Sequence, residues 1–195
     1  MNERIRMTLM ALALLCGTAA FATAQATGEV RIDLDPATTK VEFTLSDVLH
    51  MVHGSFRLKS GEIHFDPSSG VAGGLLVVNA ASGDSGNKTR DHKMSKEILE
   101  TDKYPEATFT PQQIIGHLAL QGASQVQVKG IFRVHGADHE LTLYVPAQVN
   151  GNQVQMQTGF DIPYVRWGMK DPSTFLLRVN KDVQMSISGT EKISH

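Results

Sequence analysis

Eight histidines are the residues of this chain that most readily suggest chemistry. His50 and His53 have the spacing of two metal ligands on one helical turn, and His135 and His139 flank a predicted turn. No third ligand follows either pair at a diagnostic spacing, so we interpret them as surface or turn histidines. The sequence also lacks a nucleophile elbow and a phosphate-binding loop. We therefore expect a non-catalytic protein without a metal or other cofactor, and keep a small histidine-based enzyme or metal protein as an alternative.

A polar loop and a short amphipathic segment stand between two alternating apolar runs. They cover residues 87–109 and read NKTRDHKMSKEILETDKYPEATF. Arg90 and Asp91 are the charged pair at its start, and one interpretation is an ion pair that fixes the loop. Pro105 restricts Tyr104 to extended geometry, which favours a return to the sheet there.

The elements that position this loop are predicted to be strands. Apolar and polar residues alternate over 41–45, 56–58, 63–65, 126–134, 141–145, 154–162 and 183–187, which is the period of a strand with one buried face. We expect a turn at 59–61 and one long hairpin over 123–148, with a bulge or bend at Gly130. The total is about eight strands in an all-β chain.

Helices are predicted to be few and short. Ser95 is a candidate N-cap, with Ile98 and Leu99 packing inward before the helix ends near Asp102. A second helical turn is expected at 47–51. Neither helix would cover a sheet, so the sheet must bury its apolar face against itself as a sandwich or a closed barrel. Alternation alone leaves both architectures open.

The first 26 residues have the layout of a secretory signal peptide. Arg4 and Arg6 precede an apolar run, and small residues follow it, which places cleavage after Ala24 or Ala26. The run is too short to span a bilayer, so we expect it to be removed rather than to anchor the chain. The prediction is a periplasmic or secreted protein with one domain over residues 27–195.

Composition narrows the range of partners. The chain carries 18 basic and 20 acidic residues and a formal charge of −2, with no basic cluster that would favour nucleic acid. Its single cysteine, Cys16, lies inside the predicted signal, which leaves no thiol for a disulfide or a nucleophile. A homodimer through outward apolar residues such as Leu76 or Ile131 remains open.

Several motifs resemble one bacterial family, in the same order and over most of the predicted mature chain. Residues 87–91 (NKTRD) and 104–109 (YPEATF) resemble its N-x-x-R-D and Y-P signature, and 52–56 (VHGSF) with 61–65 (GEIHF) resemble a preceding segment. Residues 130–136 (GIFRVHG) resemble a glycine-bounded strand. The chain is similar in these motifs to the YceI-like proteins, although its histidine after Arg-Asp stands one place earlier than is usual there.

This resemblance implies an extended lipocalin-like antiparallel barrel that binds a long apolar lipid of isoprenoid type, a quinone or polyprenyl species, without catalysis. An eight-strand barrel is wide enough for one slender ligand. The expected cavity lining is Phe43, Phe56, Phe65, Phe109, Phe132, Val134, Leu143, Met156, Phe160, Tyr164 and Trp167. The expected headgroup contacts at the mouth are Asn87, Arg90 and Asp91. The alternative is a protein-interaction or stress-response barrel with a filled core and no lipid.

Overall fold

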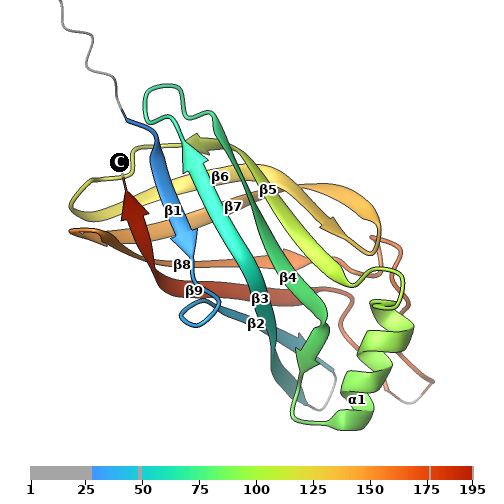
Figure 1. Cartoon of the computed structure of the whole chain (residues 1–195). Coiled ribbons are helices and arrows are strands. Elements are labelled where there is room, and N and C mark those ends of the chain that lie inside the picture. Colours follow the sequence, from blue (N-terminus) through green and yellow to red (C-terminus); the bar gives the residue numbers. More distant parts are fainter. Residues whose placement is uncertain (1–27, 48–49, 176, 195) are drawn as a thin grey trace, which may run out of the picture.

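The described part of the chain forms an antiparallel β-barrel with one helical segment (Figure 1). The computed structural model describes residues 28–47, 50–175 and 177–194. Its strands are β1 (Val30–Leu34), β2 (Lys40–Ser46), β3 (Met51–Phe65), β4 (Ala72–Asp84), β5 (Glu106–Ile115), β6 (Gly122–Val134), β7 (Ala137–Asn150), β8 (Gln153–Ile162) and β9 (Val183–Ser194). The helical segment consists of α1 (Lys88–Lys93) and the π-helical turn η1 (Met94–Ile98).

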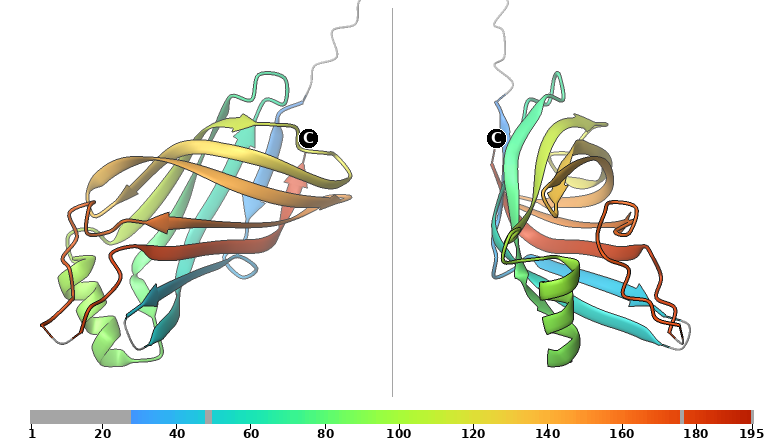
Figure 2. Two further views of the ribbon diagram at one scale, coloured as in Figure 1. Left: turned by 180° about the vertical axis from the view of Figure 1, so that it is seen from behind. Right: turned by 90° about the vertical axis from the view of Figure 1, so that its right-hand side faces the viewer.

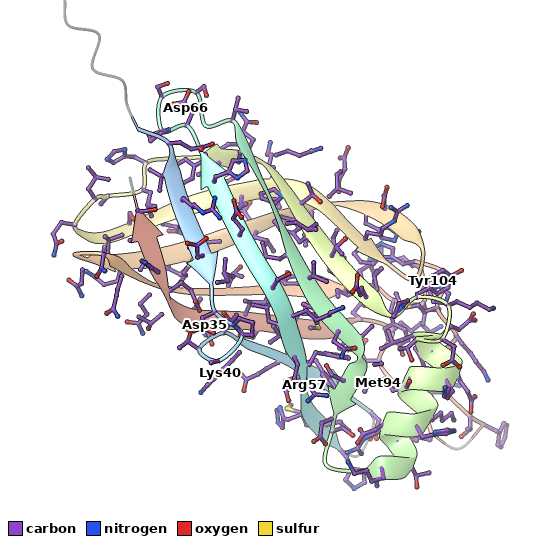
Figure 3. The ribbon with its side chains drawn as sticks, in the orientation of Figure 1. Asp35, Lys40, Arg57, Asp66, Met94 and Tyr104 are labelled. Atoms are coloured by element: carbon purple, nitrogen blue, oxygen red, sulfur yellow. The ribbon has the colours of Figure 1, made fainter. Side chains whose placement is uncertain are left out.

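Nine strands fill eight positions of the barrel. Both β1 and β2 lie between β3 and β9, where β1 pairs with the end of β3 and β2 with its beginning. A turn over residues 35–39 interrupts this position, and Figure 3 shows Asp35 and Lys40 on its two sides. Pairing of β3 with β4 closes the barrel. The predicted all-β barrel of about eight strands is confirmed.

The hairpin predicted over residues 123–148 is confirmed, because Ala123 lies opposite Gln148 in the β6–β7 ladder. The irregularity predicted at Gly130 lies in the neighbouring strand: the β5–β6 register shifts after its partner Pro111, while β6 pairs with β7 without a break through Gly130. A Cβ at Gly130 would overlap the carbonyl oxygen of Thr110. The turn predicted at 59–61 is wrong: β3 continues through it, with a register shift against β4 that absorbs the irregularity.

The helix begins earlier than predicted. Asn87, not Ser95, is the N-cap, because its side chain accepts the backbone N–H groups of Thr89 and Arg90 at 3.1 Å each. Ile98 and Leu99 pack inward as expected. Tyr104 lies where the chain returns to the sheet, with its ring 4.7 Å from that of His135 in the β6–β7 turn (Figure 3).

Two apolar clusters make up the interior of the barrel. The larger one occupies its body and includes Val149 and Val154, which are fully buried. The smaller one lies at the helical end, where the β8–β9 connection (residues 163–175 and 177–182) approaches the helix; both segments lie at that end in Figures 1 and 2. Interior packing is therefore different at the two ends of the barrel.

Some predictions fall outside the described residues or change with the structure. The predicted signal peptide lies in residues 1–27, which are not described. Of the predicted helical turn at 47–51, residues 48 and 49 are not described, while Met51 begins β3. Leu76, predicted to face outward, is 6% exposed and faces the interior. No helix within the described ranges is long and apolar enough to cross a bilayer.

Candidate ligand-binding cavity

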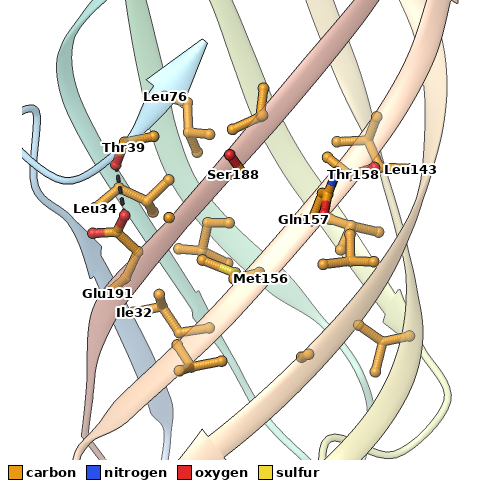
Figure 4. Close-up of a pocket in the computed structure, with 18 of the residues that line it drawn as sticks. Ile32, Leu34, Thr39, Leu76, Leu143, Met156, Gln157, Thr158, Ser188 and Glu191 are labelled. Carbon is orange, nitrogen blue, oxygen red and sulfur yellow. Dashed lines mark hydrogen bonds between the residues drawn. The ribbon is translucent and has the colours of Figure 1, made fainter. Parts of the chain in front are cut away.

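An apolar cavity lies in the body of the barrel (Figure 4). Its wall is made by inward side chains of β1 and of β3 to β9, for example Ile32, Leu76 and Leu143. The enclosed volume is about 70 Å³, and the non-atom space that surrounds it and extends to solvent is about 780 Å³. Aliphatic and aromatic walls of this kind favour an apolar ligand, since burial stabilises such a ligand by roughly 0.8 kcal/mol per methylene.

A buried carboxylate closes one side of the cavity. Glu191 is 2% exposed and faces inward from β9, opposite the turn that separates β1 from β2. Its Oε1 accepts the Thr39 hydroxyl at 2.8 Å, as Figure 4 shows, and its Oε2 accepts the Asp35 backbone N–H at 2.8 Å. The Thr38 hydroxyl donates to Oε2 at 3.2 Å. Glu191 therefore supplies the acceptors that the interrupted ladder lacks at the turn.

Gly189 makes room for this carboxylate. A Cβ at position 189 would overlap Oε1 of Glu191, so a side chain there would displace the clamp. The charge itself has no cationic partner among the ion pairs of the described residues. Three donors replace the hydration that burial removes.

The predicted lining residues divide into three groups. Four of the eleven line the cavity: Phe65, Phe109, Leu143 and Met156. Phe43 and Phe56 pack against each other, with ring centroids 5.3 Å apart, between β2 and β3. The other five belong to the cluster at the helical end: Phe132, Val134, Phe160, Tyr164 and Trp167.

This second cluster closes the helical end of the barrel. Phe132 lies 6.1 Å from Phe160 and 6.0 Å from Trp167, measured between ring centroids. The Tyr164 hydroxyl donates to the Asn180 carbonyl at 2.7 Å, and burial raises the pKa of Tyr164 to about 12. An ion pair of 2.6 Å between Lys170 and Glu97 ties the connection to the helix. We call four residues of the β8–β9 connection (Tyr164, Trp167, Lys170 and Asn180), together with Phe132 of β6, the end plug.

None of the three predicted mouth residues lines the cavity, and two of them, Arg90 and Asp91, bind Ser85 instead. Arg90 donates from Nε to the Ser85 hydroxyl at 2.7 Å and from an Nη to the Ser85 carbonyl at 2.8 Å. Asp91 accepts the Ser85 backbone N–H at 2.9 Å, and the Ser85 hydroxyl lowers the pKa of Asp91. Asn87 caps the same helix. These contacts fix the start of the helix, and a headgroup role for Arg90 stays a prediction.

His139 stacks on the end plug. Its ring is parallel to that of Trp167, with an interplanar angle of 6° and centroids 3.8 Å apart. Its Nε2 is buried without a hydrogen-bond partner among the described groups, and burial lowers the pKa of His139. The neutral imidazole is therefore the form that fits between β7 and the plug.

The lowered pKa of His139 predicts a loss of stability in mild acid. The unfolded chain takes up a proton near pH 6.5 that the folded histidine resists, so stability that is fully present above that pH falls as the pH drops below it. Urea unfolding at pH 7.5 and 5.5 should show a larger loss in the wild type than in His139→Gln. The exposed His117→Gln should keep the wild-type difference, and equal losses in all three proteins would contradict the assignment.

The site contains residues that our sequence analysis did not single out, chiefly Thr39, Thr158 and Glu191. The signal for two of them was present. Extending the period-two alternation of β9 from Val183 places Glu191 on the inward face, and the same extension in β8 places Thr158 there. Thr39 lies in a turn, where no periodicity applies.

A closed antiparallel barrel around an apolar cavity is a lipocalin-like architecture. The model of the YceI-like domain matches residues 32–190, and the chain belongs to this family. A UPF0312 protein of Pseudomonas savastanoi pv. phaseolicola is 30% identical over 69% of this chain and 77% of its own length. A UPF0312 protein of Yersinia enterocolitica is also 30% identical, over 50% of this chain and 57% of that protein.

Solved structures share the fold at low identity. BcnA of Burkholderia cenocepacia superimposes with a TM-score of 0.65 and 19% identity, over 84% of this chain and all of that one. A polyisoprenoid binding domain from Saccharophagus degradans, implicated in plant cell wall breakdown, gives 0.61 and 16%, over 84% and 98% of the two chains. These likenesses establish the barrel architecture.

Proposed function

We propose that this protein binds and carries a long apolar lipid of isoprenoid type, a quinone or a polyprenyl species, without catalysing a reaction. The observation that carries the proposal is the apolar cavity inside a closed barrel. Family membership and the polyisoprenoid binding domain that shares the fold support the ligand class. The predicted signal peptide supports a periplasmic or secreted location, where an exposed prenyl chain would need a carrier.

The size of the cavity sets a condition on this function. Pockets that hold drug-sized ligands measure roughly 300–1,000 Å³, whereas the enclosed volume here is about 70 Å³. A long chain therefore enters only when interior side chains move. The end plug is the part to move, because all of it except Phe132 belongs to the β8–β9 connection, outside the barrel ladder, at the helical end of the interior.

The small cavity also favours a second candidate, a protein-interaction barrel with a filled core. Its prediction is opposite: the purified protein carries no lipid and takes none up. The two functions are separated by ligand analysis alone.

The test is native mass spectrometry of mature protein purified from the periplasm, followed by organic extraction and uptake of added quinones or polyprenols. We expect a discrete bound mass that matches an isoprenoid. Leu143→Trp, which fills the cavity, should abolish it, and Tyr144→Trp on the next, 57% exposed position should not. The protein mass in the same spectrum reports cleavage after residue 24 or 26. A lipid-free wild type without uptake would favour the interaction barrel.

A further inference from the structure

The barrel wall has a seam between β7 and β8. Their shared ladder runs only from the Asn150–Gln153 pair to the Ala147–Met156 pair. Beyond it, β7 pairs with β6 and β8 pairs with β9 (Figure 2). The two strands therefore part beside Met156, and no ladder bonds between them hold the wall closed from there on.

A groove of about 570 Å³ lies on the outer face at this seam. Five residues line both the groove and the inner cavity: Ala147, Met156, Gln157, Ser188 and Gly189. Because the same residues border both spaces, one layer of residues separates the cavity from solvent here. The groove therefore marks a thin part of the wall beside the short ladder, and the parted strands run from there toward Phe160 and His139 at the end plug.

An unpartnered hydroxyl faces inward beside the seam. Thr158 lines the cavity from β8, is 8% exposed, and its Oγ1 has no hydrogen-bond partner among the described residues. A buried polar group without a partner is unfavourable, and a hydroxyl can either donate or accept. Gln157, its neighbour in β8, is exposed and stands on the opposite face of the strand, so Thr158 is the polar side chain that faces inward here. A ligand group with a carbonyl or hydroxyl oxygen would satisfy Thr158.

The charges around the cavity argue against a phosphate. No lysine, arginine or histidine is among the residues that line it, and its one ionisable group, Glu191, is an acid whose oxygens already accept three hydrogen bonds. A phosphate drawn inside would lose its hydration without a counter-charge. Lys40 is the one cationic residue that lines the outer groove, and it does not line the cavity.

From these features we infer that the cavity selects a prenyl lipid whose head is an uncharged carbonyl or hydroxyl group, bound by Thr158 beside the seam, over a prenyl phosphate. The inference rests on the proposed lipid-binding function and narrows its ligand class. It places the polar head at the side of the barrel and the tail toward the end plug.

The test compares three ligands with the same prenyl chain: farnesol, farnesyl diphosphate and the hydrocarbon farnesene. Each competes with a fluorescent apolar probe on the mature protein and on Thr158→Val, which keeps the side-chain shape but loses the hydroxyl. We expect farnesol to bind the wild type more tightly than the diphosphate. Thr158→Val should weaken farnesol about tenfold, leave farnesene unchanged, and unfold at the same or a higher temperature because no unpaired hydroxyl remains.

Controls separate the inference from the function it rests on. Thr158→Ser should retain farnesol binding, and Thr110→Val, an exposed strand position in β5, should change nothing. Equal weakening of farnesol and farnesene, or tighter binding of the diphosphate that is lost in Lys40→Ala, would overturn the neutral-head assignment while lipid binding stands. Failure of all three ligands to displace the probe would overturn lipid binding itself.

Discussion

Replacing Glu191 with alanine is expected to lower the free energy of unfolding by about 3 kcal/mol. The change leaves the Asp35 N–H and the hydroxyls of Thr38 and Thr39 without their acceptor at the break between β1 and β2. Of these residues Thr39 is buried, and a buried donor without a partner costs about 1–3 kcal/mol. Asp35 and Thr38 are exposed, and the Thr38 hydroxyl also lies 3.3 Å from the Asp35 carbonyl oxygen, so their donors add less. In a chain of this size the loss corresponds to a fall in melting temperature of roughly 6–12 °C, measured by circular dichroism.

Two further variants make this result specific. Lys192→Ala, at the exposed neighbouring position, should stay within about 0.5 kcal/mol of the wild type. Gly189→Ala should be destabilising alone but much less so in the Glu191→Ala background, because the carboxylate that it meets is then gone. Additive losses in the double variant, or a melting temperature of Glu191→Ala equal to that of Lys192→Ala, would show that the carboxylate does not clamp the turn.

Closure into a barrel was expected from the family resemblance, because alternation left a sandwich and a barrel open. The strands themselves were largely predictable because each buries one face. That constraint fixes a period of two, so the β6–β7 hairpin and the apolar body of the barrel follow from alternation. The break between β1 and β2 was not predictable in the same way. It depends on the carboxylate of Glu191, more than 150 residues further along the chain. An acidic residue on the inward face interrupts the apolar pattern, and the sequence does not show which donors would bind it.

The cavity was less predictable than the barrel for a related reason. Alternation predicts that Phe65 faces inward, and the aromatic residues gathered around Trp167 favoured a lining role there, but neither pattern says whether a side chain borders empty space or fills it. Phe65 borders the cavity, whereas Trp167 packs on His139 and Phe132 in the end plug. The role of Arg90 could not be predicted for the same kind of reason. A guanidinium that binds the nearby Ser85 and a guanidinium that is free to bind a ligand occur in the same sequence motif.

These packing differences give the end plug a thermodynamic role in ligand binding. If a long tail must displace Trp167, the free energy of binding that lipid becomes less favourable by the free energy that holds the plug in place. A short tail that ends within the cavity does not incur this cost. Chain length should therefore decide whether a change in the plug alters binding.

Trp167→Ala is expected to bind a long-chain prenyl quinone about tenfold more tightly than the wild type, with little change for a short-chain analogue. The variant should lose about 2 kcal/mol of stability, because a half-buried indole and its stack on His139 are removed. Titration calorimetry with both quinones measures the two affinities. Phe175→Ala, an aromatic substitution in the same connection at a 99% exposed position, is the matched control and should alter neither affinity. Weaker binding of both quinones by Trp167→Ala would instead make Trp167 a lining residue that contacts the ligand, since a plug side chain opposes the long tail and a lining side chain holds it.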